Sequence, residues 1–275
     1  MTLLLALQLT IPAGLDTYIP TPDDNPITRE GAELGRKLFF DKSLSRDRTV
    51  SCATCHIPEQ AFTDGKPLAV GLANRLGKRR TPTIVNRGYG KSFFWDGRSP
   101  SLEDQVLKPI QNPDEMDLTL GEASQRVSLD AGAISKALAT YVRAILAGDS
   151  PYDRYLRGDK SALTNEQIAG LRLFRGKANC TSCHIGPNLS DERLHNTGFG
   201  DFKTPTLREA ARRPPYMQDG SLATLAEVIE HYDKGGKPEP SLDPEIRKLN
   251  LTAEEKAALL AFLRSLSGVV KDGYR

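Results

Sequence analysis

Apolar and polar positions along the chain recur mainly at helical spacing. The clearest stripe lies in residues 131–147, where apolar side chains return every three or four positions. A second stripe occupies residues 259–266, near the C-terminus. No segment shows a convincing strand pattern, and residues 57–100 combine many Gly, Pro and Arg with little periodicity. The pattern predicts an all-α protein whose helices are joined by long loops.

Capping residues mark where the predicted helices begin. Thr28 is expected to cap a helix that runs to about Phe40. Elsewhere a Ser or Thr is followed three positions later by an acidic residue or Gln, which is the spacing of a capping box. This spacing occurs at Ser101/Asp104, Thr164/Gln167, Thr224/Glu227 and Thr252/Glu255.

The chain also repeats itself. Three short patterns occur once in each half: Leu38-Phe39 and Leu173-Phe174, Thr81-Pro82-Thr83-Ile84 and Thr204-Pro205-Thr206-Leu207, Asp96-Gly97 and Asp219-Gly220. In this register Pro109 and Tyr232 are equivalent, because each lies thirteen positions after its Asp. We therefore interpret the halves as an internal duplication, in which Pro109 and Tyr232 take the same place in their domains.

The repeat suggests where the domains begin and end. We expect an N-terminal arm at residues 1–26, a first domain at 27–155 and a second at 156–275, with the boundary between Gly148 and Leu163. Residues 1–11 are apolar but have no Lys or Arg before their Leu run. They are either the remnant of a signal peptide or an apolar arm packed on the protein.

Composition removes several classes of function. Charged residues make up 26% of the chain and hydrophobic residues 39%, which is typical of a globular protein. The formal net charge is only +2, so nothing favours binding to nucleic acid. No stretch reaches the roughly 18 consecutive apolar residues that a membrane span needs.

The four cysteines all belong to two copies of one motif. These are Cys52-Ala53-Thr54-Cys55-His56 and Cys180-Thr181-Ser182-Cys183-His184. A Cys₄ zinc site or redox disulfides could use the cysteines, but neither explains the His that follows each pair. C-x-x-C-H is the attachment motif of c-type haem, whose iron takes the His as an axial ligand. The sequence thus predicts two covalent haem c groups and, since attachment normally follows export, a periplasmic protein.

Longer motifs resemble the bacterial di-haem cytochrome c peroxidase family, which includes MauG-type enzymes. The resemblance extends from about Gly35 to Gly268. It rests on both haem motifs and on Leu38-Phe39-Phe40-Asp41, Phe94-Trp95-Asp96-Gly97-Arg98, the set Gln105, Pro109 and Glu115, and Pro215-Tyr216-Met217-Gln218-Asp219-Gly220. It implies two cytochrome c-like haem domains, with peroxide reacting at the first haem and electrons passing through the second.

The resemblance also implies roles for the residues beside the first haem. Glu115 would move a proton between the peroxide oxygens as general acid and base, and Gln105 and Pro109 would shape the same pocket. Many relatives close this haem with a second His. This sequence has no His between His56 and His184, and Met116 lies inside the Glu115 motif. We therefore expect the first haem to be open at rest.

At the second haem the family places Met or Tyr opposite the motif His. The matching residue is Tyr232, while neighbouring His231 and, less well, Met217 are alternatives. An anionic phenolate ligand would favour the higher oxidation states of iron. The resemblance further places Trp95, the only Trp, between the haems as an electron relay.

A calcium ion between the domains is a family feature that this sequence puts in doubt. Arg80 stands where the family has an Asn ligand, and Arg213 and Pro215 stand where backbone carbonyls bind the ion. Calcium requires oxygen ligands, which an Arg side chain does not offer. Calcium therefore stays an open question.

Three functions are compatible with the sequence. The first is a haem peroxidase, an oxidoreductase that reduces hydrogen peroxide with electrons from a small cytochrome or cupredoxin. The second is a MauG-like oxidase that uses peroxide to modify Trp or Tyr residues of a partner protein. The third is a plain di-haem electron carrier, which Glu115 and Gln105 argue against.

Overall fold

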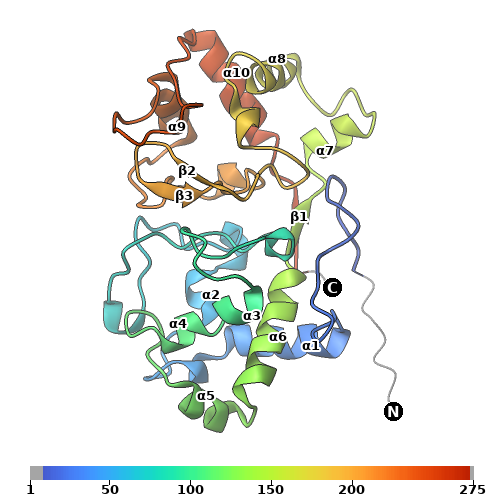
Figure 1. Cartoon of the computed structure of the whole chain (residues 1–275). Coiled ribbons are helices and arrows are strands. Elements are labelled where there is room, and N and C mark those ends of the chain that lie inside the picture. The colour runs from blue at the N-terminus through green and yellow to red at the C-terminus, as the bar shows by residue number, and fades with distance from the viewer. Residues whose placement is uncertain (1–8, 273–275) are drawn as a thin grey trace.

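The computed structural model describes residues 9–272, and these form two stacked lobes (Figure 1). The lower lobe contains α1 (Arg29–Phe40), α2 (Cys52–Cys55), α3 (Leu102–Gln105), α4 (Lys108–Gln111), α5 (Leu120–Val127) and α6 (Ala131–Arg143). The upper lobe contains α7 (Pro151–Leu156), α8 (Asn165–Arg175), α9 (Leu225–Asp233) and α10 (Ala253–Arg264). The described chain also contains several 3₁₀ turns and four short strands: β1 (Leu146–Gly148), β2 (Leu194–Asn196), β3 (Asp201–Lys203) and β4 (Val269–Lys271).

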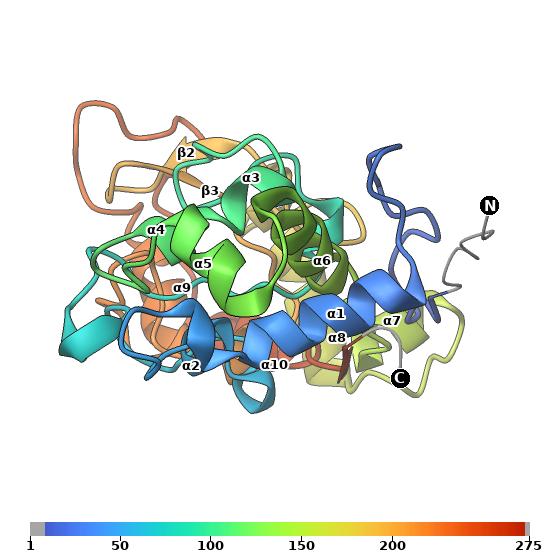
Figure 2. The ribbon, with the colours of Figure 1, turned by 90° about the horizontal axis from the view of Figure 1, so that it is seen from below.

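Each lobe is organised around one crossed pair of helices. In the lower lobe α1 lies across α6, as the view from below shows (Figure 2), and in the upper lobe α8 packs on α10. A glycine allows each close crossing. A Cβ on Gly35 would lie 1.9 Å from the carbonyl oxygen of Ala137, and one on Gly170 would lie 1.9 Å from that of Ala258. The two lobes therefore share one packing device.

Aromatic packing repeats in the same way. Phe39 of α1 and Tyr141 of α6 have ring centroids 5.1 Å apart, and so do Phe174 of α8 and Phe262 of α10. These rings lie in two separate hydrophobic clusters, one in each lobe. Two helix-rich domains, each with its own core, follow from this arrangement.

The predicted caps are formed, with one difference. Thr28 accepts a hydrogen bond from the Gly31 amide, and Thr164, Thr224 and Thr252 begin complete capping boxes. Ser101 caps α3 by accepting from the Asp104 amide, but the Asp104 carboxylate pairs with Lys108 at 2.6 Å. Local capping chemistry is thus readable from sequence.

The expectation of an all-α protein is wrong in detail. The helix expected to reach residue 147 ends at Arg143, and Leu146–Gly148 forms β1, which pairs antiparallel with β4. A second antiparallel pair joins β2 and β3. All three residues of β1 are buried, so the segment shows no alternation of apolar and polar positions. A short, wholly apolar run is compatible with a buried helix as well as with a buried strand. Only a distant partner segment decides between the two.

The N-terminal arm contacts both lobes. Arg208 Nη2 donates to the Gly14 carbonyl at 2.7 Å, and the hydroxyl of Tyr89 donates to the Asp16 carbonyl at 2.7 Å. Ile19 is buried. A signal peptide was one interpretation of residues 1–11, of which residues 1–8 lie outside the described part. No helix among residues 9–272 is long and apolar enough to cross a membrane.

Candidate haem sites

The first C-x-x-C-H motif forms a single helical turn. Ser51 and Thr54 make a capping box that begins α2, so Cys52 and Cys55 lie on one turn directly before His56. The Nδ1 atom of His56 lies 3.0 Å from the Phe62 carbonyl oxygen. Because a carbonyl only accepts, Nδ1 carries the proton and Nε2 keeps its lone pair for a metal.

The second motif repeats this geometry. Cys180–Ser182 form a 3₁₀ turn, and Nδ1 of His184 lies 2.9 Å from the Leu189 carbonyl oxygen. Burial lowers the pKa of His184, as it lowers the pKa of His56, which favours the neutral imidazole in both motifs. Neutral, oriented imidazoles in both motifs fit axial ligation of haem iron.

The alternative uses of the cysteines find no support. All four cysteines are free. Among residues 9–272, the only three metal-ligating side chains grouped closely enough to hold an ion are Cys183, Asp191 and His195, so no Cys₄ zinc site exists there. Burial raises the pKa of Cys52 and of Cys180 to about 12, which favours the neutral thiol.

A cavity in the upper lobe is lined by the second motif. Cys180, Cys183 and His184 contribute to its wall, together with Tyr232 of α9 and Trp95 from the lower lobe. Much of the remaining lining is apolar, from α8, α9 and α10. Two thiols, an oriented imidazole and an apolar wall fit a covalently attached haem.

Tyr232 and its neighbour His231 are placed differently. Tyr232 lines the cavity, and burial, followed by the charges of Cys180 and Cys183, raises its pKa to about 12. His231 does not line it: its Nε2 lies 2.9 Å from the Thr197 carbonyl, and its ring packs on Phe199. Met217 also lines the cavity.

Glu115 lies beside the first motif. Burial raises the pKa of its carboxyl group. Burial is also the main reason why the pKa of Cys52 and of Cys55 is raised, and the negative charge of Glu115 adds a smaller contribution to both. Asn112 Nδ2 donates to Glu115 Oε1 at 2.6 Å. The structure thus brings the predicted carboxylate and the first haem motif together.

The loop that carries Glu115 is fixed through its backbone. The Leu72 amide donates to the Glu115 carbonyl at 2.9 Å, and the Met116 amide donates to that of Pro109 at 3.2 Å. A Cβ on Gly71 would lie 2.0 Å from the carbonyl oxygen of Asp114. Pro109 of α4 is half-buried, as is Gln105 at the end of α3, whereas Met116 is buried in the core.

Trp95 lies at the junction of the lobes. Its indole Nε1 donates to the Arg80 carbonyl at 3.0 Å, and its own carbonyl accepts from the Lys203 amide of β3 at 2.8 Å. Nearby, Glu192 pairs with Arg87 of the lower lobe at 2.7 Å and with Lys203 at 3.4 Å. Trp95 is therefore held by both lobes.

Two arginines meet at the position that the resemblance assigned to calcium. Arg80 Nη2 donates to the carbonyl oxygen of Arg213 at 2.9 Å. That carbonyl is one of the oxygens which the resemblance assigned to calcium. A guanidinium group therefore uses an oxygen that a calcium ion would need.

His195 lies between two carboxylates. Its Nδ1 is 2.6 Å from Asp243 and its Nε2 is 2.8 Å from Asp191. Burial alone would lower the pKa of His195, but the hydrogen bonds to Asp243 and Asp191 raise it. Both ring nitrogens are occupied, which makes His195 a poor iron ligand.

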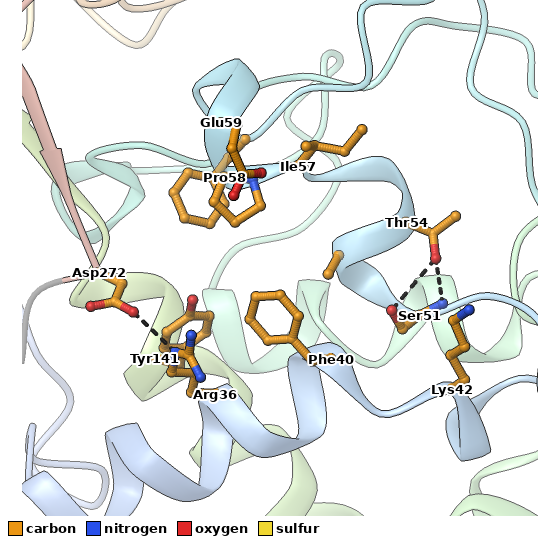
Figure 3. A pocket seen from close by; sticks show the side chains of 12 residues that line it. Arg36, Phe40, Lys42, Ser51, Thr54, Ile57, Pro58, Glu59, Tyr141 and Asp272 are labelled. Atoms are coloured by element: carbon orange, nitrogen blue, oxygen red, sulfur yellow. Dashed lines mark hydrogen bonds and ion pairs between the residues drawn. The ribbon is translucent and has the colours of Figure 1, made fainter.

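A second hollow lies against the outer side of the first motif (Figure 3). Arg36 pairs with Asp272 there at 3.0 Å, and the hydroxyls of Ser51 and Thr54 lie 3.5 Å apart. None of the residues predicted to hold haem or to react with peroxide lines this hollow. It is separate from the candidate chemistry.

Sequence reasoning assigned no role to several residues of these sites. Burial raises the pKa of the Glu115 carboxyl group, and the hydrogen bond from Asn112 and the positive charge of Arg98 partly offset this increase. Two signals were available in the sequence: Arg98 ends the Phe94–Arg98 motif quoted for the family resemblance, and Asn112 lies three positions before Glu115. Arg213 also lines the cavity of the second motif. From the sequence, Arg213 was noted only because it stands at a position that the resemblance assigned to a calcium ligand.

Comparisons with known proteins agree with this geometry. Residues 29–133 match the family model described as di-haem cytochrome c peroxidase, and residues 167–267 match the one described as cytochrome c. The chain is 37% identical to the methylamine utilization protein MauG of Methylorubrum extorquens, over 90% of this chain and 81% of that protein. It is 31% identical to the cytochrome c551 peroxidase of Pseudomonas aeruginosa, over 88% and 80% of the two chains.

Solved structures show the same fold. A MauG-like protein associated with microbial copper homeostasis superposes with a TM-score of 0.85 and 32% identity, covering 92% of this chain and 94% of that one. The diheme peroxidase BthA from Burkholderia thailandensis gives a TM-score of 0.72 at 21% identity, covering 97% and 95%.

Proposed function

Because the chain belongs to the di-haem cytochrome c peroxidase family, we propose that it reduces hydrogen peroxide at its first haem motif with electrons that enter through its second. The observation that carries this is the position of Glu115, a half-buried carboxylate that accepts a hydrogen bond from Asn112. Its backbone carbonyl accepts from the Leu72 amide, two residues after Val70, whose own carbonyl accepts from the Cys55 thiol at 3.6 Å. A protein that only carries electrons does not need a proton-transferring carboxylate beside its haem motif.

The residues that would hold the cofactors follow from the motifs. Cys52, Cys55 and His56 would bind the first haem, and Cys180, Cys183 and His184 the second. When bound, the haem irons supply the site for peroxide and the capacity to accept and release electrons. The bonds from His56 to Phe62 and from His184 to Leu189 orient both imidazoles.

Glu115 would transfer the proton. Cleavage of an O–O bond is easier when the leaving oxygen is protonated, and a carboxylate can take a proton from one peroxide oxygen and return it to the other. The raised pKa of Glu115 brings it closer to the working pH range of such a group. Gln105 and Pro109 would shape the same pocket.

The two haem sites would differ in ligation. With no His between the two motifs and Met116 in the core, we propose that the first haem is open at rest. At the second, Tyr232 lines the cavity and His231 does not, which supports Tyr232 as the sixth ligand. Trp95, held by both lobes, would lie on the electron path between them.

We further infer that the domains arose by duplication and divide within residues 148–163. The matching helix crossings at Gly35 and Gly170 support this. A periplasmic location is proposed because the haem motifs require attachment after export. The bond from Arg80 to the Arg213 carbonyl supports a junction without calcium, so chelation should leave the peroxide reaction unchanged.

A MauG-like activity is the second candidate. Here the electrons would come from Trp or Tyr residues of a partner protein instead of a small cytochrome or cupredoxin. Two observations favour it: the position of Tyr232 at the second site, and the 37% and 34% identity to two proteins named MauG.

One experiment tests the proposal. The oxidised protein is mixed with one equivalent of hydrogen peroxide, and its visible and near-infrared absorption is recorded. A rapid Soret change indicates an open peroxide haem, and an added near-infrared band favours the MauG-like activity. A spectrum that changes only after prior reduction contradicts the open first haem, and no reaction in either state removes the peroxidase proposal.

A further inference from the structure

Two buried arginines line the cavity of the second haem motif. Arg80 comes from the lower lobe and Arg213 from the upper, 133 positions apart in the chain, and both border the cavity that contains Cys180, Cys183 and His184. Their exposed fractions are only 6% and 7%. Two cationic side chains are thus almost fully removed from solvent.

Their hydrogen bonds leave part of each guanidinium unsatisfied. Arg80 Nη2 donates to the Arg213 carbonyl at 2.9 Å, and Arg213 Nη2 donates to the carbonyls of Thr206 and Arg208 at 2.7 and 2.9 Å. The Nε atoms of both arginines are buried without a hydrogen-bond partner in the described chain. Leaving a buried charged donor unpaired costs more than leaving a neutral one.

The nearby carboxylates do not fill this gap. Asp64 accepts from Thr81 at 2.9 Å and from the Lys66 amide at 3.1 Å. Glu209 accepts from the Gly268 amide at 2.7 Å and pairs with Arg212 at 3.2 Å. Within residues 9–272, neither carboxylate lies within 4.0 Å of a charged nitrogen of Arg80 or Arg213. The Nε atoms of Arg80 and Arg213 are therefore available to bind an anionic group that is not part of the polypeptide.

We propose that Arg80 and Arg213 bind the propionate carboxylates of the second haem and thereby raise its reduction potential. The inference rests on the proposed function, because it requires a haem at the second motif. Haem c brings two carboxylates into a cavity that both arginines line, and a guanidinium is suited to pair with a carboxylate. Reduction adds negative charge, which two buried cations stabilise.

This pairing would also involve the electron path. The Arg80 carbonyl accepts the indole hydrogen bond of Trp95. One residue would therefore hold the second haem through its side chain and position Trp95 through its backbone. The arginine pair would link the cofactor of the upper lobe to a side chain of the lower lobe.

The test is a spectroelectrochemical titration of the holoprotein and of the variants Arg80→Gln and Arg213→Gln. Both variants should keep two haems, and the second haem should titrate at lower potential. At a fixed potential its oxidised-to-reduced ratio should rise about tenfold, equivalent to about 59 mV for one electron. Arg80→Lys and Arg213→Lys keep the charge, should recover part of the shift, and serve if a Gln variant fails to fold.

The matched control is Arg212→Gln. Arg212 adjoins Arg213 in sequence but pairs with Glu209 and does not line the cavity, so its variant should titrate like the wild type. Unchanged potentials in the Gln variants would overturn the inference. So would a wild-type potential that follows the chloride or phosphate concentration, because a free anion would then occupy the pair. A wild-type haem content below two per chain would instead refute the proposed function.

Discussion

The two lobes share the same arrangement of crossed helices, α1 on α6 and α8 on α10. They differ in the helix that follows Asp96-Gly97 in the lower lobe and Asp219-Gly220 in the upper lobe. In the upper lobe α9 is continuous from Leu225 to Asp233 and presents Tyr232 to the cavity. In the lower lobe the stretch that matches it in the sequence repeat is broken into α3 and α4, and Pro109 is the residue that the repeat aligns with Tyr232. Proline has no amide hydrogen and disrupts a helix interior.

This single difference has a consequence for chemistry. The Pro109 carbonyl accepts from the Met116 amide, which fixes the loop that carries Glu115. At this point of the repeat the lower lobe therefore has Pro109, which fixes the Glu115 loop that we propose transfers protons, and the upper lobe has Tyr232, which we propose binds iron. The same pair of crossed helices can therefore support either reaction with a substrate or electron transfer. The residue at this one position of the repeat, Pro109 or Tyr232, makes the difference.

The largest expected effect comes from Glu115. Glu115→Gln removes the proton-transferring carboxylate, so the rate of the Soret change with peroxide should fall about 100-fold or more. Stopped-flow absorption measures this rate. Asp114→Asn is the control, since Asp114 is exposed on the same loop. An unaffected rate in the Glu115 variant would exclude it from the mechanism.

The shared frame itself can be tested at the helix crossings. Gly35→Ala and Gly170→Ala should each destabilise the protein by about 1–3 kcal/mol, because the new methyl group meets a backbone carbonyl. Gly121→Ala is the matched control: this helical glycine has open space around its Cβ position, so about 0.5–1 kcal/mol of stabilisation is expected. Thermal denaturation followed by circular dichroism measures the stability of all three variants. Equal effects in the three would contradict the inference that Gly35 and Gly170 permit the close helix crossings.

The ligand of the second haem distinguishes the lobes spectroscopically. Tyr232→Phe should change the visible and electron paramagnetic resonance spectra of the second haem but leave the first haem's reaction with peroxide intact. His231→Asn should leave both spectra unchanged, because His231 does not line the cavity. An unchanged spectrum in the Tyr232 variant would point instead to His231 or to Met217, which also lines the cavity.

The smallest effect concerns pH. The carboxylates of Asp243 and Asp191 raise the pKa of His195 despite its burial, so the charged form stabilises the fold. That contribution is complete below the ordinary His pKa of about 6.5 and is lost as pH rises through the higher folded value. His195→Asn should lower the thermal midpoint more at pH 6 than at pH 9.

His231 provides the opposite control. Burial lowers the pKa of His231, so the neutral form is the one favoured in the folded protein. The destabilisation caused by His231→Asn should therefore be no smaller at pH 9 than at pH 6. A His195 variant whose loss of stability did not depend on pH would show that the ion pairs contribute nothing.

Features with a local cause were determined by the sequence. The haem motifs occupy five consecutive residues each, and the caps at Thr28, Thr164, Thr224 and Thr252 depend on groups three positions away. The repeat aligns Pro109 with Tyr232 from the spacing of residues along the chain alone. Such features need no knowledge of what lies across the molecule.

Tertiary structure alone decided the remaining features. Strands β1 and β4 form because two buried segments from distant parts of the chain share their backbone hydrogen bonds. Arg80 and Arg213 meet across 133 positions, and Trp95 is held by both lobes. Hydrogen bonding and burial depend on partners that the fold brings together. No local pattern records which distant segment will supply them.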